Sequence, residues 1–269
     1  ELTLAMGFNL VRKHQKIEDP RYLFWADQLG LLVWNEMPSG RIFSTALIHD
    51  LTHEWMSIIE RDQAHPSIIG WVPFNESWGV WNQRQRPEQR HFVDAIFHLT
   101  KALDPSRPVI GNDGWEYSTG DLWTLHLYDT TEQTLASRLQ ALIEQPSGPV
   151  HDGAEPRVGA LPGADPRGKP ILLTECGGIG LITPEALMDD APFAYGDLPT
   201  TVTELTARTE ALLAAIAATP AIDGFVWTQF TDVQQEINGL LTFNREPKIP
   251  LEILRSMILS VGQQDAVGQ

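Results

Sequence analysis

Short apolar runs alternate with longer amphipathic stretches along most of the chain. The apolar runs, which predict strands, cover residues 7–12, 31–34, 68–74, 108–112, 122–128, 170–175 and 224–230. Several are apolar at almost every position, as is typical of parallel strands covered on both faces. Helical patterns lie between them, over residues 20–29, 45–63, 87–103, 131–145 and 201–218. This strand–helix alternation predicts an α/β protein with a parallel sheet.

The length and strand count make the predicted fold more specific. A chain of 269 residues favours a closed TIM-type (β/α)8 barrel over an open, doubly wound sheet. No GxGxxG or GxxxxGK[ST] loop follows a strand, so a nucleotide-binding fold lacks its signature. Only seven strands are predicted, and residues 1–6 have the pattern of a helix end. We therefore expect residues 1–269 to be a single barrel domain, without its first strand and most of its first helix, cut from a longer chain.

Composition excludes several classes of partner. The net charge of −16 argues against binding to nucleic acid or to an anionic membrane. Cys176 is the only cysteine, and no CxxC or HExxH spacing occurs, so neither a metal site nor another cofactor is predicted. A signal peptide has a basic segment followed by an apolar one, and this pattern is not seen in the sequence. This observation favours the cytoplasm. Residue 1 does not resemble a natural start, so the compartment stays open.

Polar residues gather where the predicted strands end, and in a (β/α) barrel the chemistry lies at the carboxyl ends of strands. The residues at these ends are Arg12, His14, Asn35, Glu36, Asn75, Glu76, Asn112, Asp113, His126, Tyr128, Glu175 and Trp227 to Gln229. Glu76 and Glu175 stand out because each directly ends an apolar run. They are 99 positions apart (175 − 76), or three repeats of about 33 residues, which predicts strands four and seven.

A pair of carboxylates across a barrel mouth suits one chemistry in particular. Cleavage of a glycosidic bond needs one carboxylic acid to protonate the leaving oxygen and a second carboxylate opposite it. The nine tryptophans add aromatic faces that can stack on sugar rings as well as fill a core. Glu76 and Glu175 are therefore the candidate catalytic pair, and a carbohydrate is the candidate substrate.

The motifs also resemble a known family. The segments are "GFNLVRKH", "ADQLGLLVWNEMP", "HPSIIGWVPFNESWG", "DPSRPVIGNDGW", "KPILLTECGG" and "GFVWTQFTD". In this order they are similar to the catalytic barrel of glycoside hydrolase family 2, which includes β-galactosidases, β-glucuronidases and β-mannosidases. "NE" closing the fourth strand and "TE" closing the seventh are the specific elements. The resemblance implies a retaining enzyme on a (β/α)8 barrel, with β-sandwich domains preceding it; a homo-oligomer is left open.

The resemblance also implies roles for individual residues. Glu76 would be the general acid/base and Glu175 the nucleophile. Substrate-binding roles fall on Asn75 at the sugar 2-hydroxyl, Arg12 holding Glu175 ionised, Tyr128 against the nucleophile, Trp227 as the floor under the sugar, and His14, Asp113 and His126 as further contacts. The two carboxyl groups are expected roughly 5–5.5 Å apart, the spacing of retaining enzymes.

Two departures from the family pattern bear on substrate and packing. Cys176 follows Glu175 where the family commonly has an aromatic residue. The stretch "EINGLLTFNREPK" has Asn238-Gly239-Leu240 where β-glucuronidases carry Asn-x-Lys. This weakens the glucuronide reading, and a β-galactosidase-like exo-β-glycosidase is expected. β-Glucuronidase, β-mannosidase and arabinosidase stay open within the enzyme class.

Two other classes compete with a glycosidase. In one, a catalytically inactive barrel binds a saccharide in the same pocket; the presence of both glutamates argues against it. In the other, a barrel hydrolase uses a metal; His14, alone on its strand, argues against this class. Outside the strand ends, the stretch 146–168 is rich in Gly and Pro and predicts a mobile surface loop on the face opposite the catalytic one.

Overall fold

A computed structural model describes residues 1–151, 156–182 and 192–262. The chain divides into two compact units. Unit 1 comprises Glu1–Phe8, Leu127–Ile143 and Glu175–Gln269. Unit 2 comprises Asn9–His126 and Glu144–Thr174. The unit boundaries fall between His126 and Leu127 and between Thr174 and Glu175.

Unit 2 is built on a parallel sheet of strands β1 (Leu10–Lys13), β2 (Leu32–Glu36) and β3 (Ile68–Val72), in that order. All three fall within or beside runs that the sequence predicts as strands. Trp34, Val72 and Ile110 form a buried cluster at this sheet. Because the ladders are parallel, all three carboxyl ends lie at one edge of the sheet. Glu36 is the last residue of β2, and Arg12 lies one position before the end of β1.

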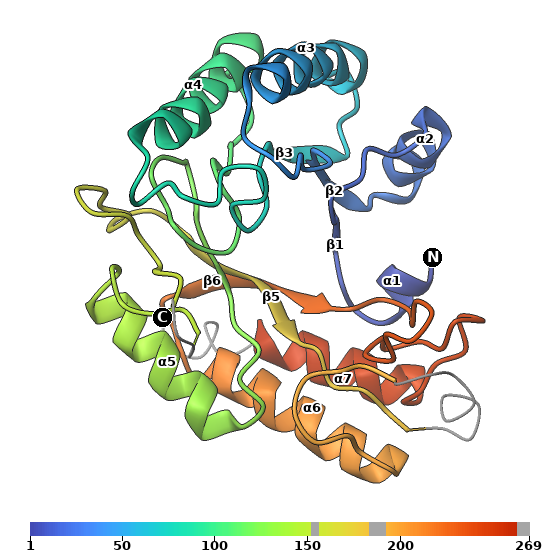
Figure 1. Cartoon of the computed structure of the whole chain (residues 1–269). Coiled ribbons are helices and arrows are strands. Elements are labelled where there is room, and N and C mark those ends of the chain that lie inside the picture. The colour runs from blue at the N-terminus through green and yellow to red at the C-terminus, as the bar shows by residue number, and fades with distance from the viewer. Residues whose placement is uncertain (152–155, 183–191, 263–269) are drawn as a thin grey trace. The chain divides into compact units, whose positions relative to one another are not determined.

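Helices α2 (Pro20–Leu29), α3 (Thr45–Asp62) and α4 (Pro87–Leu103) also belong to unit 2, and their positions match the predicted helical stretches. Ser44 caps α3 by accepting a hydrogen bond from the Leu47 amide at 3.1 Å. α3 and α4 lie side by side near β3 (Figure 1). Trp55 of α3 is buried edge-on against Trp71 of β3, and its indole N–H donates to the Thr100 hydroxyl at 2.8 Å. These contacts fasten both helices to the sheet.

The predicted strand at 108–112 is wrong as a full strand. This segment pairs with β3 only through an isolated parallel bridge, Trp71 to Val109. Its other edge is occupied by its own following loop: Ile110 pairs with Gly120, and the Asp121 amide donates to the Val109 carbonyl at 2.9 Å. The backbone groups that would extend the ladder are therefore already paired.

A second three-stranded sheet has the order β4 (Trp123–His126), β5 (Ile171–Gly177) and β6 (Ile222–Thr228). β4 belongs to unit 2, β6 to unit 1, and the unit boundary crosses β5. The Trp123 amide donates to the Pro170 carbonyl, and the Leu127 amide donates to the Glu175 carbonyl. This advancing register is that of parallel strands. Over the described residues the strands thus form two three-stranded sheets, and the predicted eight-stranded closure and missing first strand stay predictions.

Unit 1 contains α1 (Leu2–Ala5), α5 (Glu132–Glu144, except its last residue), α6 (Val202–Ala217) and α7 (Leu251–Val261). The helix end expected at residues 1–6 is present as α1. The sequence prediction missed α7, which begins after Pro250 and buries Leu254, Met257 and Ile258. α6 and α7 lie side by side (Figure 1). No helix among the described residues combines the length and apolar character needed to cross a membrane.

Candidate active site

Glu76 lies in a tight turn that follows β3. After Val72 the chain continues to Asn75, which pairs with Asp113, and the Glu76 amide donates to the Asp113 carbonyl at 2.9 Å. Glu76 and Ser77 then adopt left-handed backbone conformations, with φ of +51° and +58°. Such conformations are uncommon for residues other than glycine and cluster at functional sites. The Glu76 side chain is 22% exposed, so its carboxyl group is accessible from outside the core.

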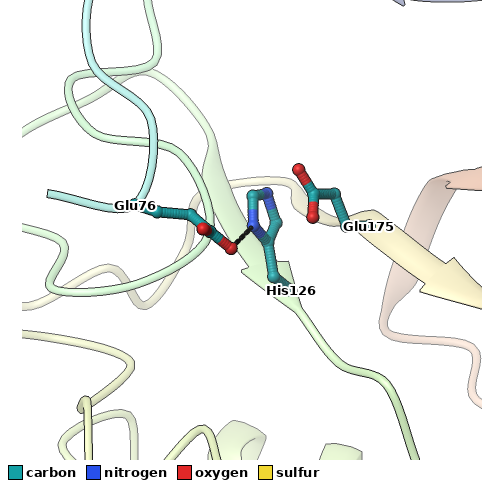
Figure 2. Close-up of side chains that lie close together, drawn as sticks. All are labelled: Glu76, His126 and Glu175. Atoms are coloured by element: carbon teal, nitrogen blue, oxygen red, sulfur yellow. Dashed lines mark hydrogen bonds and ion pairs between the residues drawn. The ribbon is translucent and has the colours of Figure 1, made fainter. Parts of the chain in front are cut away.

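His126, the last residue of β4, holds the Glu76 carboxyl group. The distance between His126 Nδ1 and Glu76 Oε1 is 2.8 Å, and the imidazole is almost fully buried (Figure 2). Gly114 lies directly behind the ring, with φ of +96°. A Cβ atom at Gly114 would lie only 2.5 Å from His126 Nδ1. A glycine is therefore needed here both for the backbone conformation and for the close approach of the imidazole.

Arg12 connects three of the polar residues at the strand ends. Its Nε lies 2.7 Å from Glu36 Oε2 and 2.8 Å from Asp113 Oδ2, and its Nη2 donates to Asn75 Oδ1 at 2.6 Å. Arg12 and Glu36 thus form a buried ion pair. The bond to Oδ1 fixes the orientation of the Asn75 amide. Asn75 Nδ2 is buried without a hydrogen-bond partner among the described residues and is left as a donor.

The two carboxyl groups beside Arg12 have opposite pKa shifts. Burial raises the pKa of Glu36 to about 7, against the attraction of Arg12 and with help from the negative charge of Asp113. Burial would also raise the pKa of Asp113, but Arg12, His126 and a hydrogen bond from the Thr174 hydroxyl hold it well below its usual range. Asp113 is therefore the ionised partner of Arg12, while Glu36 changes charge near neutral pH.

The raised pKa of Glu36 predicts a pH-dependent cost in stability. Between its ordinary pKa of 4.5 and about 7, the unfolded chain loses this proton while the folded chain keeps it. Stability is thus retained below pH 4.5 and declines as the pH rises to about 7. We expect Glu36→Gln to lose less stability than the wild type between pH 4.5 and 7.5, measured by urea unfolding.

The matched control for that experiment is Glu60→Gln, at an exposed position on α3. It should follow the wild-type dependence of unfolding free energy on pH. Identical pH slopes for Glu36→Gln and the wild type would contradict the assignment of a raised pKa to Glu36.

The second glutamate, Glu175, lies on β5 (Figure 2) and has its own partners in unit 1. The Tyr128 hydroxyl donates to Glu175 Oε2 at 2.6 Å, so the contact expected for this tyrosine is present. The Tyr128 ring stacks on Tyr195 with a centroid separation of 3.7 Å and an interplanar angle of 3°. Burial and the charge of Glu175 raise the pKa of Tyr128 above its ordinary value, so the hydroxyl stays protonated and remains a donor.

The residues after Glu175 pack tightly. A Cβ atom at Gly177 would lie 2.4 Å from the Trp227 indole, so the absence of a side chain allows this tryptophan to lie against the strand. Cys176 is fully buried, and its thiol donates to the Val226 carbonyl at 3.5 Å. Burial and the nearby Glu175 charge raise the pKa of the thiol, which keeps it protonated. Cys176 thus behaves as a small buried side chain beneath Glu175.

The prediction that 146–168 is a loop confined to the opposite face is wrong for its described part; residues 152–155 lie outside the described residues. Arg157 donates to Glu116 Oε1 at 3.0 Å, and Ser77, next to Glu76, donates to Glu116 Oε2 at 2.5 Å. The exposed His151 ring contacts Trp115 edge-on. Glycine and proline content alone did not reveal these contacts, which brace the turn that carries Glu76.

The structure divides the predicted residues between the two units. Unit 2 brings together Arg12, His14, Asn75, Glu76, Asp113 and His126, and unit 1 holds Tyr128, Glu175 and Trp227. His14 is the most open of the first group, with 57% of its side chain exposed, and its Nδ1 lies 3.6 Å from Glu36 Oε1. Sequence reasoning listed Glu36 among the strand-end residues without a catalytic or substrate-binding role, and it gave no role to Thr174. Their signal was position, since each stands at or beside the carboxyl end of an apolar run.

Comparison with solved structures shows which fold this chain has. Its parallel α/β architecture matches that of TIM-type structures. A β-galacturonidase from Eisenbergiella tayi bound to galacturonate superposes with a TM-score of 0.72 over 96% of this chain and 46% of that chain, at 20% identity. A Bifidobacterium dentium β-glucuronidase complexed with coumarin-3-O-glucuronide gives a TM-score of 0.73 over 96% and 42%, at 18% identity. At these identities the likeness shows the fold.

Sequence comparison supplies the family. The family described as "Glycosyl hydrolases family 2, TIM barrel domain" matches residues 1–177, so the chain belongs to it. A β-galactosidase from Alteromonas mediterranea is 29% identical over 183 residues, 63% of this chain and 15% of the relative. The β-glucuronidase of Canis lupus familiaris is 32% identical over 101 residues, 35% of this chain and 15% of the relative. The chain thus spans a small part of the length of these relatives.

Proposed function

We propose that this protein is a retaining exo-β-glycosidase, β-galactosidase-like in preference, that releases a sugar from the non-reducing end of a glycoside. Glu175 is the nucleophile and Glu76 the general acid/base. Membership of glycosyl hydrolase family 2 supports the class of reaction. The role of each residue rests on its local environment, which differs between the two glutamates.

The observation that carries the proposal is that two residues of one short segment each contact the carboxyl group of one of the two glutamates. His126 contacts the Glu76 carboxyl group, and Tyr128, two residues later, donates to the Glu175 carboxylate. Residues two positions apart in an extended chain project to the same side. This spacing supports the proposal that Glu76 and Glu175 act on one glycosidic bond, with a carboxyl separation of roughly 5–5.5 Å expected for a retaining pair.

The chemistry proceeds in two displacements. The Glu175 carboxylate attacks the anomeric carbon while the bond to the leaving oxygen breaks and Glu76 gives its proton to that oxygen. A covalent glycosyl-enzyme results. Glu76, now a carboxylate, takes a proton from water, whose oxygen attacks the same carbon and displaces Glu175. The Tyr128 hydroxyl stabilises the negative charge of Glu175 before the attack and after its release.

The surrounding residues bind the sugar in this proposal. The Asn75 amide, held through Oδ1 by Arg12, offers its Nδ2 donor to the sugar 2-hydroxyl. Arg12 also favours ionisation of Glu175, and Trp227 forms the floor under the sugar. Direct sugar contacts for His14, Asp113 and His126 remain predictions. The Asp113 and His126 side chains are buried, which favours a supporting role for both.

A buried lysine bears on the choice of sugar. A uronide substrate needs a cation for its carboxylate, and Lys248 lies in the stretch where one would be sought. Its Nζ is bonded to Asp232 Oδ1 at 2.6 Å and to the Ile237 carbonyl at 2.8 Å. The side chain is almost fully buried, and burial lowers the pKa of this lysine. The Lys248 ammonium group is thus already bound by neighbouring groups of the chain, which supports a neutral sugar as the substrate.

A panel of aryl β-glycosides tests this preference. With the purified protein that carries this chain, we expect the highest kcat/KM on the galactoside among the galactoside, glucuronide, mannoside, glucoside and arabinoside. A glucuronide as the best substrate would contradict the assignment of a neutral sugar while leaving the glycosidase class intact. Absence of turnover on the whole panel, with retained binding of a sugar, would contradict the enzyme assignment itself.

A further inference from the structure

We propose that His126 and Glu76 share one proton and that His126 acts as the positioning residue that keeps the acid/base in its proton-donating form. This inference rests on the proposed function of Glu76. It gives His126 a task other than the direct sugar contact predicted from sequence. The 2.8 Å contact between His126 Nδ1 and Glu76 Oε1 carries it (Figure 2).

The other ring nitrogen determines how the proton is placed. His126 Nε2 lies 3.4 Å from Asp113 Oδ2. Asp113 is ionised, because the Arg12 guanidinium, with Nε 2.8 Å from Oδ2, holds its pKa well below its usual range. A carboxylate beside Nε2 favours the tautomer that carries its hydrogen there. In that tautomer Nδ1 has a lone pair, and the short contact requires a hydrogen from the Glu76 carboxyl group.

The same proton has a second location. If it moves from Glu76 to Nδ1, the products are a carboxylate and an imidazolium, and the latter lies between Glu76 and Asp113. Either state of the pair contains one transferable proton. During release of the aglycone, that proton passes to the leaving oxygen from whichever state holds it, which leaves Glu76 as a carboxylate and His126 as a neutral imidazole. During hydrolysis, the proton taken from water returns to the pair. The pair therefore holds the same number of protons before and after one catalytic cycle.

The packing around the ring holds this geometry in place. Gly114 leaves room for Nδ1, and Trp115 lies edge-on to the imidazole with a centroid separation of 6.0 Å. The charged groups that face His126 from the surrounding elements of unit 2 are Glu76, Asp113 and, through Asp113, Arg12. A ring fixed between two carboxyl groups suits transfer of a proton to one of them.

The kinetic test compares leaving groups. His126→Asn places an amide near the Nδ1 position, which keeps a hydrogen bond but carries no transferable proton. We expect this variant to lose about ten- to a hundredfold in kcat/KM on an alkyl glycoside, which needs protonation of the leaving oxygen. On a dinitrophenyl glycoside, which does not, the loss should stay below about threefold. Trp115→Phe, which disturbs only the packing, should lower kcat/KM by the same factor on both substrates.

A second test needs no activity and stays informative if His126→Asn folds poorly. The His126 imidazole is followed by NMR over a pH titration in the wild type and in Glu76→Gln. Replacement of the Glu76 carboxyl group by an amide should lower the titration midpoint of His126 by about one pH unit, because the imidazolium then has no Glu76 carboxylate as a partner. Unequal leaving-group effects together with this shift support the shared proton.

Two results would overturn the inference. One is an equal loss on both glycosides in His126→Asn, which would mark the histidine as merely structural. The other is an unchanged His126 midpoint in Glu76→Gln. Failure of the proposed function has a different signature, since the wild type would then turn over neither glycoside.

Discussion

Glu175→Gln is expected to lower kcat on the preferred aryl β-glycoside by about 10⁴-fold or more, because loss of a nucleophile removes the covalent route. The amide can still accept the Tyr128 hydrogen bond, so folding and substrate binding should change little. Steady-state kinetics measure the first effect, and calorimetric titration with the free sugar measures the second. The variant should therefore bind sugar without cleaving its glycoside.

The matched control is Glu210→Gln, an exposed glutamate on α6 in the same unit. It should keep wild-type kcat and KM. Turnover by Glu175→Gln close to the wild-type rate would contradict the nucleophile assignment. A wild-type protein that binds sugar but shows no turnover, with affinity unaffected in the variant, would identify an inactive sugar-binding barrel instead.

Glu76→Ala should show the second large effect, with a dependence on the leaving group. Removal of a general acid costs about 10²–10⁴-fold in rate where the leaving oxygen must be protonated. The first step should survive on a dinitrophenyl glycoside, whose leaving group needs no proton, so that the glycosyl-enzyme accumulates. Added azide, which attacks without a general base, should restore turnover and yield a glycosyl azide. Burst kinetics and product analysis measure both.

Glu88→Gln on α4 is the control for this experiment, because Glu88 is exposed and lies in unit 2. It should behave as the wild type with and without azide. A Glu76→Ala variant that loses the same factor on good and poor leaving groups, and does not respond to azide, would show that Glu76 is not the acid/base.

Much of the fold was predictable because apolar runs and helical patterns are local features. The run at 68–74 and the amphipathic pattern at 45–63 correspond to β3 and α3. The segment 108–112 has an equally strand-like pattern, but its edge is taken by its own following loop. A neighbouring strand and a local loop compete for the same backbone groups, and the outcome depends on the tertiary structure. The pattern of apolar residues along the segment therefore does not predict it.

The candidate site was predictable to a similar degree. The strand-end rule selected Arg12, Asn75 and Glu76, and the structure joins Arg12 to Asn75 by a hydrogen bond. The rule did not show that Glu36 shares Arg12 with Asp113, because the two carboxyl groups that converge on this guanidinium come from segments far apart in the sequence. The contact between His126 and Glu76 likewise joins residues 50 positions apart in the chain.

The stereochemistry of the first product tests the central claim most directly. The preferred aryl β-glycoside is hydrolysed in an NMR tube by the purified protein that carries this chain, and the anomeric proton is recorded before mutarotation. Two displacements at one carbon predict that the β-anomer forms first, with the α-anomer growing in later. An α-anomer as the first product would contradict a covalent intermediate on Glu175 and, with it, the roles assigned to both glutamates.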